Sequence, residues 1–205
     1  MDSTLELEVT KTKPKYPKLQ VISEDGHLGE AKQNRERRRR QALADVDLWS
    51  FPPTDWEAET VREIQRLPTV QALRFAEHKL AYMRMHPREC FANTRFYQEN
   101  DPTGLSEQVL GWWPQNDNYV LHAVIKTSGK YFCLTPSPHH PENPFEFIPD
   151  PLIKLREIDG FRVAFRKDFR IGPGVRTDPK KTLAQCDTLR ERLNSGMEPH
   201  MAMLL

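Results

Sequence analysis

The sequence predicts an α+β fold, in which helices pack on a mainly antiparallel sheet. Apolar residues recur at helical spacing in two stretches before residue 84 and in one stretch after residue 178. Between them, residues 108–165 hold several short segments rich in β-branched and aromatic residues, separated by turn residues. Hydrophobic residues make up 38% of the 205 residues and 17 residues are proline, so we expect part of the chain to lie outside the packed domain.

The first 45 residues are expected to form a disordered, basic N-terminal arm, because they hold too few large apolar groups to offset the entropy of ordering. The arm carries an arginine cluster made of Arg35, Arg37, Arg38, Arg39 and Arg40. This cluster is interpreted either as a contact for an anionic partner, such as nucleic acid, or as a solvated charge run that aids solubility. The net charge of the whole chain is +1, so its overall field favours no class of partner.

Two helices are predicted at the start of a single domain, which we place at residues 46–196. Thr54 and Glu57 form a capping-box pattern that starts the first helix, and Pro68 ends it. A second helix is expected to begin at Thr69, because the apolar residues after it follow helical spacing. These apolar positions are Val70, Leu73, Ala76, Leu80 and Met83.

A further helix is predicted to close the domain. Asp178 is placed to cap its N-terminus, with Pro179 at the first helical position and Gly196 just beyond the end. Its apolar stripe consists of Leu183, Cys186, Leu189 and Leu193. Residues 197–205 then remain as a short C-terminal tail.

The centre of the chain predicts a hairpin that places a histidine opposite polar groups. Ser128-Gly129 fits a two-residue hairpin loop, which pairs Thr127 with Lys130. Counting back along the ladder then sets Val124 opposite Cys133 and His122 opposite Thr135, so these residues share one face. The expected strands are 108–113, 118–127, 130–135, 145–148, 152–156 and 161–165.

Cys90 and His122 are the side chains of this region that could carry chemistry. Pro87, Arg88 and Glu89 are predicted as the first turn of a helix, which places Cys90 close to the helix N-terminus, where a thiolate is favoured. A thiol nucleophile needs an imidazole within reach and a third group that fixes the imidazole's tautomer. The alternative is that both residues are core side chains, since cysteine is among the most often buried residue types.

The order of these residues resembles the core of the transglutaminase-like and papain-like cysteine enzymes. The matching features are Cys90 on a helix, Gly111-Trp112, His122-Ala123, the Gly129 turn and a strand that ends in Leu134-Thr135-Pro136. They cover about a quarter of the chain. In that family a cysteine, a histidine and an acid form the catalytic group.

By this resemblance Cys90 matches the nucleophile and His122 the base, while Cys133 stands where the family has its acid. This departure leaves Thr135, Asn93 or Gln115 as the group that orients the imidazole, or else implies an inactive site. The oxyanion would be stabilised by Asn93, Gln115 or backbone N–H groups at the helix start.

The sequence therefore favours thiol-dependent acyl transfer or hydrolysis at an amide bond of a protein or peptide. Protease, deamidase, amidase and transglutaminase activities stay open, and so does a non-catalytic interaction module whose basic arm meets an anionic partner or nucleic acid. We expect no cofactor and no metal. Three widely spaced cysteines and no long apolar run favour a cytoplasmic protein without a membrane span or disulfide framework.

Overall fold

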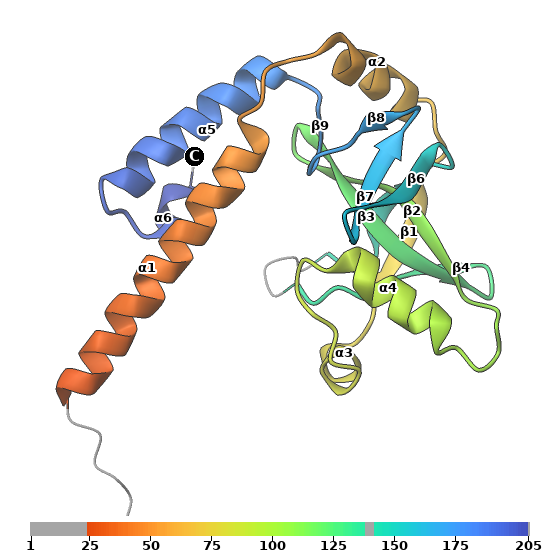
Figure 1. The fold of residues 1–205 in the computed structure, drawn as a ribbon, viewed down its shortest axis with the longest axis horizontal. Helices are drawn as coiled ribbons and strands as arrows, with labels where there is room; N and C mark the ends of the chain where they lie inside the picture. Colours follow the sequence, from red (N-terminus) through yellow and green to blue (C-terminus); the bar gives the residue numbers. More distant parts are fainter. Residues whose placement is uncertain (1–23, 138–141, 205) are drawn as a thin grey trace, which may run out of the picture.

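A computed structural model describes residues 24–137 and 142–204. Within these residues the chain forms six helices and nine strands (Figure 1). The helices are α1 (Glu24–Trp49), α2 (Asp55–Ile64), α3 (Glu77–Tyr82), α4 (Cys90–Glu99), α5 (Pro179–Asn194) and α6 (Pro199–Ala202). The strands are β1 (Val70–Arg74), β2 (Glu107–Gln115), β3 (Asn118–Thr127), β4 (Lys130–Cys133), β5 (Phe145–Pro149), β6 (Ile153–Ile158), β7 (Phe161–Arg166), β8 (Phe169–Arg170) and β9 (Gly174–Arg176).

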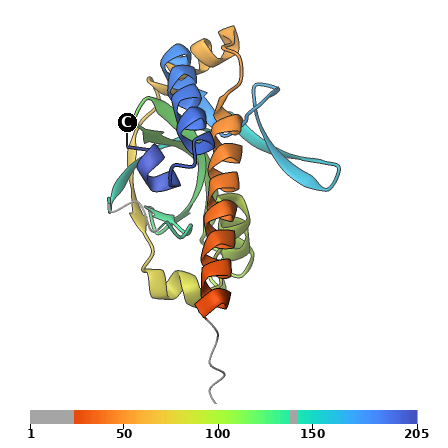
Figure 2. The same ribbon diagram turned by 90° about the vertical axis from the view of Figure 1, so that its left-hand side faces the viewer.

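The larger sheet closes on itself. Its strand order is β2-β5-β1-β4-β3-β9, and β2 also pairs with β3, so that β2, β5, β1, β4 and β3 form a ring. All of its pairings are antiparallel except that of β1 with β4. In the described part of the chain β6, β7 and β8 form a second sheet, whose β6–β7 hairpin projects from the body (Figure 2). The α+β class is confirmed, but the strands divide into a barrel and a separate small sheet.

The predicted helix from Thr69 to Met83 is wrong in its first half. Val70–Arg74 is strand β1, which pairs with β4 on one side and with β5 on the other. Only Glu77–Tyr82 is helical, as α3. Backbone pairing on both edges and burial of Ala72 outweigh the weak helical preference of this stretch, because helix propensity is readily overridden by tertiary contacts.

The central hairpin forms with the predicted loop and register. Thr127 pairs with Lys130, and both loop residues have positive φ, 48° at Ser128 and 73° at Gly129, as a type I′ turn requires. The ladder between β3 and β4 ends at the Ile125–Phe132 pair, so the predicted pairs of Val124 with Cys133 and of His122 with Thr135 do not form. The two strands therefore separate just before they reach His122, which leaves a seam in the wall of the barrel.

The expectation of a disordered arm over residues 1–45 is wrong for residues 24–45, which belong to helix α1; residues 1–23 lie outside the described residues. The last turns of α1 bury Val46 against α5 and α6, so the helix is fixed by tertiary packing. This cluster consists of Ala42, Leu43, Val46, Trp49, Cys186, Leu189, Leu193 and Ala202. Part of the predicted tail is thus helix α6, packed on α5 and α1.

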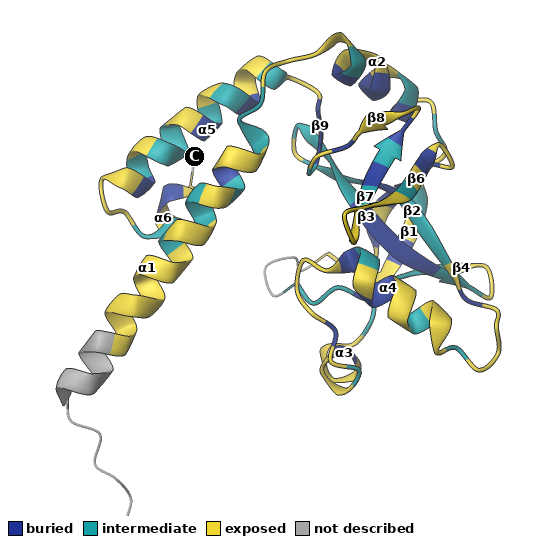
Figure 3. Cartoon of the chain, viewed as in Figure 1, coloured by how far each residue is buried: buried dark blue, intermediate teal, exposed yellow. Residues whose placement is uncertain are grey.

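The earlier turns of α1 extend away from this cluster and are exposed (Figure 3). α1, α5 and α6 lie together on one side of the barrel, while α4 packs on β2 and β3 (Figures 1 and 2). No helix in residues 24–137 and 142–204 is long and apolar enough to cross a membrane.

A buried ion pair connects helix α2 to strand β9. Thr54 caps α2 by accepting a hydrogen bond from the amide of Glu57, as predicted. The Glu57 carboxylate does not return to the cap. It receives hydrogen bonds from the guanidinium and the backbone amide of Arg176, at 2.8 to 2.9 Å. Both side chains are almost fully buried, so their attraction is little screened by water.

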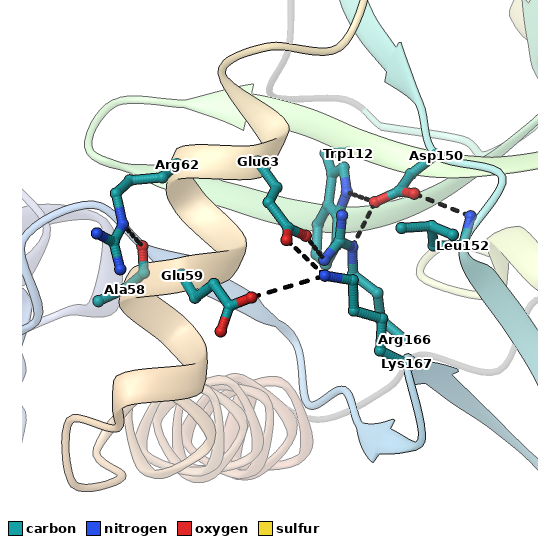
Figure 4. Close-up of polar contacts among 9 residues, drawn as sticks. All are labelled: Ala58, Glu59, Arg62, Glu63, Trp112, Asp150, Leu152, Arg166 and Lys167. Atoms are coloured by element: carbon teal, nitrogen blue, oxygen red, sulfur yellow. Dashed lines mark hydrogen bonds and ion pairs between the residues drawn. The ribbon is translucent and has the colours of Figure 1, made fainter.

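A second polar network fixes the small sheet to the barrel and to α2 (Figure 4). Asp150 accepts hydrogen bonds from the indole N–H of Trp112 at 2.8 Å and from Arg166 Nε at 2.7 Å. Arg166 also pairs with Glu63, which Lys167 contacts from the solvent side. Hydrogen bonds from Lys167 and Arg166 lower the pKa of Glu63 to about 2. The carboxylate therefore stays charged at every pH at which the protein is normally handled.

Candidate functional site

The barrel interior contains a contact between an imidazole and a thiol. Nε2 of His122 lies 3.3 Å from Sγ of Cys133, and both side chains are buried. The aromatic rings of Trp113, Phe145 and Phe147 surround the imidazole, with ring centroids 5.6 to 6.4 Å away. The hairpin register predicted that His122 and Cys133 face the same side, and the structure brings them into direct contact.

Arg74 is the third polar side chain at this contact. Its Nη1 lies 3.9 Å from the sulfur of Cys133, and its guanidinium stacks on the rings of Trp113 and Phe145 at 5.0 and 4.6 Å from their centroids. The backbone carbonyl of Glu142 accepts a hydrogen bond from Arg74 Nε. Burial raises the pKa of the Cys133 thiol, and the positive charge of Arg74 opposes that rise.

Cys90 lies at the seam between β3 and β4. It is close to the helix N-terminus, as predicted, but α4 begins at Cys90 itself, because Arg88 has a positive φ of 69° and the predicted first turn is not helical. The Ala123 backbone amide is directed at the Cys90 sulfur. The predicted preference for a thiolate is wrong, because burial raises the pKa of the Cys90 thiol to about 11 despite the nearby amides. At pH 7 about one molecule in ten thousand then carries a Cys90 thiolate.

The side chains of Cys90, His122 and Cys133 are all buried, Cys133 most deeply. Cys90 is 7% exposed, His122 is 6% exposed and Cys133 is 1% exposed. The charge of one thiolate disfavours ionisation of the other, which places Cys133 close to Cys90. The structure therefore shows a direct contact between His122 and Cys133, with Cys90 near Cys133.

The other three predicted site residues have different roles. The Thr135 hydroxyl is buried and makes no hydrogen bond to the imidazole of His122, but it lies near the Cys133 sulfur and helps to lower the pKa of that thiol. Asn93 uses its side-chain amide to bond the backbone N–H and C=O of His86, which fixes the loop before α4. Gln115 pairs with Asn118 at the far end of the β2–β3 ladder, roughly 13 Å of strand from the level of His122.

Sequence reasoning missed Arg74 and the aromatic groups that hold it. The reason is the wrong helix at Thr69, since a helix gives no cause to place Arg74 beside Cys133. The alternation of Val70, Ala72 and Arg74 was the available signal, because these positions share one face of a strand. Residues 70–74 are too few for this alternation to distinguish a strand from a helix.

The helical cluster contains a separate cavity of about 920 Å³. Its floor is apolar and includes Trp49 and Leu189, while Lys181 and Asp117 at its rim form an ion pair with each other. Cys186 also lines it, but the pair of Cys133 and His122 does not. Among the described residues no group of three His, Cys, Asp or Glu side chains is arranged to hold a metal ion.

Comparison of the chain with protein-family models, with curated proteins and with solved structures finds no significant match. The proposals below therefore rest on the sequence and on the geometry of this chain.

The raised pKa of Cys90 predicts a loss of stability in alkaline solution. The unfolded thiol ionises near pH 9 and the folded one near pH 11, so the unfolded state releases its proton first as the pH rises. The Cys90 thiol therefore makes its full contribution to the free energy of unfolding below about pH 9. This contribution, about 2 to 3 kcal/mol, is lost as the pH rises to about 11. Urea unfolding of wild type and Cys90→Ala across this range should show a steeper decline for the wild type. Parallel curves would contradict the burial of this thiol.

Proposed function

We propose that the chain is a thiol-dependent enzyme that acts on an amide bond by acyl transfer or hydrolysis, with Cys90 as nucleophile and His122 as base. The contact between His122 Nε2 and Cys133 Sγ carries this proposal. It supports the proposal because Cys133, which the resemblance sets where the family has its acid, contacts the imidazole of His122.

In the first half of the reaction, the sulfur of Cys90 forms a bond to the amide carbonyl carbon while its proton passes to His122. The carbonyl oxygen becomes an oxyanion, for which the backbone N–H groups of Ala123 and of the start of α4 supply stabilising dipoles. The C–N bond then breaks, and the leaving amine takes the proton from His122. The product of this half is a thioester on Cys90.

In the second half, water or an amine attacks the thioester carbonyl and His122 takes its proton. The C–S bond breaks, and the proton returns to the sulfur of Cys90. The pKa of about 11 means that the resting site holds a neutral thiol. The imidazole must therefore act as a general base during attack, because a preformed thiolate is too rare.

A chromogenic ester tests this proposal without knowledge of the natural substrate. We expect p-nitrophenyl acetate to acetylate Cys90 and to release one p-nitrophenol per site in an initial burst, with the thioester visible by mass spectrometry. Cys90→Ala should abolish the burst, and His122→Ala should slow it by about a hundredfold or more, the usual contribution of a general base.

Cys186→Ala is the matched control, because Cys186 is also buried but lies in the helical cluster with α1 and α6. Its burst should equal that of the wild type. A burst that survives in Cys90→Ala, or acetylation spread over all three thiols, would exclude Cys90 as the nucleophile.

One observation favours a second function, that of a non-catalytic interaction module with the same core. Cys90 is 7% exposed with a pKa of about 11, so in the resting structure it is closed to solvent and protonated. Under this alternative His122 and Cys133 are packing residues of the barrel. The absence of any burst, with a normally folded protein, would favour the module.

A further inference from the structure

The exposed part of α1 presents arginines that no carboxylate neutralises. Residues 30–38 are all exposed, and residues 30–40 hold six basic and two acidic side chains. Arg35 pairs with Glu198 of the loop before α6, and Arg39 lies 3.8 Å from Glu36. Arg37, Arg38 and Arg40 have no ion pair with any residue in the described ranges.

Arg37 and Arg40 lie on the side of α1 that faces away from the helical cluster, while Arg38 lies at the edge of that cluster and lines its cavity. At about 100° per residue, Arg40, Arg37 and Arg38 spread over roughly 160° of the helix circumference. Arg35 and Arg39 point toward the same side as Val46, which packs on α5. The free positive charge therefore covers a half-cylinder of the helix.

The composition of this half-cylinder distinguishes between anionic partners. A helix that lies in a membrane surface needs an apolar face, and residues 32–40 contain no apolar side chain. The cations are arginines, whose planar guanidinium groups bind phosphate oxygens in pairs. No aromatic residue stands among them to stack on the bases of a single strand.

We propose that the arginine face of α1 binds duplex nucleic acid, with the helix lying in a groove. A helix with its side chains is about 10 to 12 Å wide, and the major groove of B-form DNA is about 12 Å wide. Phosphates line both walls of a groove, so arginines spread over a half-cylinder reach both walls at once. A flat anionic surface would contact fewer of them.

This binding is sequence-independent, because Arg37, Arg38 and Arg40 contact phosphates and the helix offers few side chains that read base edges. The interaction is separate from the thiol site, since Cys90 is on α4, which packs on β2 and β3, and His122 is on β3, whereas α1 packs on α5 and α6. The proposal therefore stands whether or not the chain is an enzyme.

The test measures fluorescence anisotropy of a labelled 24-base-pair DNA duplex with the full chain at 50 to 200 mM KCl. Three phosphate contacts predict a log–log salt slope of about −2.7, or roughly a 40-fold loss of affinity over this range. The triple variant R37Q/R38Q/R40Q should bind at least tenfold more weakly at 50 mM KCl and show a nearly flat salt dependence. Glutamine preserves helix propensity, and circular dichroism confirms that α1 remains.

The matched control is R66Q/K154Q/R162Q, which removes three exposed charges from α2's end and the β6–β7 hairpin. It should bind the duplex as tightly as the wild type. If both triple variants weaken duplex binding equally, the affinity depends only on the net charge of the protein, and the proposal is overturned. Binding to phosphatidylserine vesicles or to the single strand as tight as to the duplex would also overturn it.

Discussion

Replacing Cys133 by Asp is expected to raise the rate at which iodoacetamide alkylates Cys90 at pH 7.5 by about ten- to a hundredfold, or roughly 1.4 to 2.7 kcal/mol. His122 Nε2 lies 3.3 Å from the sulfur that the carboxylate would replace. A negative charge there stabilises the imidazolium that forms when His122 takes the proton of Cys90, which a neutral thiol cannot do. Arg74, 3.9 Å from the same sulfur, offers the buried carboxylate a second partner.

Two variants separate charge from shape in this experiment. Cys133→Asn has nearly the same shape as Cys133→Asp without the charge, so it should leave the alkylation rate within a few-fold of the wild type. Thr135→Val should also change little, because the Thr135 hydroxyl makes no hydrogen bond to His122. The rates are read by mass spectrometry of the Cys90 peptide. If Asp and Asn at position 133 give the same rate, His122 is not coupled to Cys90 and the interaction module is the better interpretation.

Turn and helix-cap residues in the sequence correctly predicted those parts of the fold that depend on contacts between residues close together in the chain. The loop at Ser128-Gly129 set the register of β3 and β4, and that register placed His122 and Cys133 on one face. Asp178 caps α5 by accepting a hydrogen bond from the Lys181 amide. In each case the deciding contact lies within a few residues, so sequence spacing is sufficient.

Long-range contacts decided the parts that the sequence did not predict. β1 is a strand because β4 and β5, more than fifty residues later, supply pairing on both edges. α1 forms over residues that look disordered alone, because α5 and α6 cover its last turns.

The acidity of Cys90 likewise depends on contacts that spacing does not report. A helix start favours a thiolate, but the packing of α4 on β3 removes water from the sulfur and raises its pKa to about 11. Sequence alone therefore located Cys90, His122 and Cys133 but gave the wrong protonation state for Cys90. The neighbour Arg74 was missed because it reaches the site from β1.

The buried pair of Glu57 and Arg176 predicts the largest effect on stability. Glu57→Gln is expected to lower the free energy of unfolding by about 3 to 5 kcal/mol, because it leaves the Arg176 guanidinium buried without a counter-charge. The same carboxylate also accepts the Arg176 backbone amide, so strand β9 loses an anchor to α2. A typical domain has only about 5 to 15 kcal/mol of stability, so the variant approaches the limit of folding.

The matched control for this variant is Glu59→Gln, two residues along the same helix. Glu59 is 61% exposed and lies 3.6 Å from Lys167, so its loss should cost no more than about 1 kcal/mol. Urea unfolding followed by circular dichroism measures both. The double variant Glu57→Met with Arg176→Met should recover stability relative to Glu57→Gln, because removing both charges together removes the desolvation cost. Equal destabilisation by Glu57→Gln and Glu59→Gln would show that water reaches the Glu57 carboxylate and that α2 is held to β9 mainly by its apolar contacts.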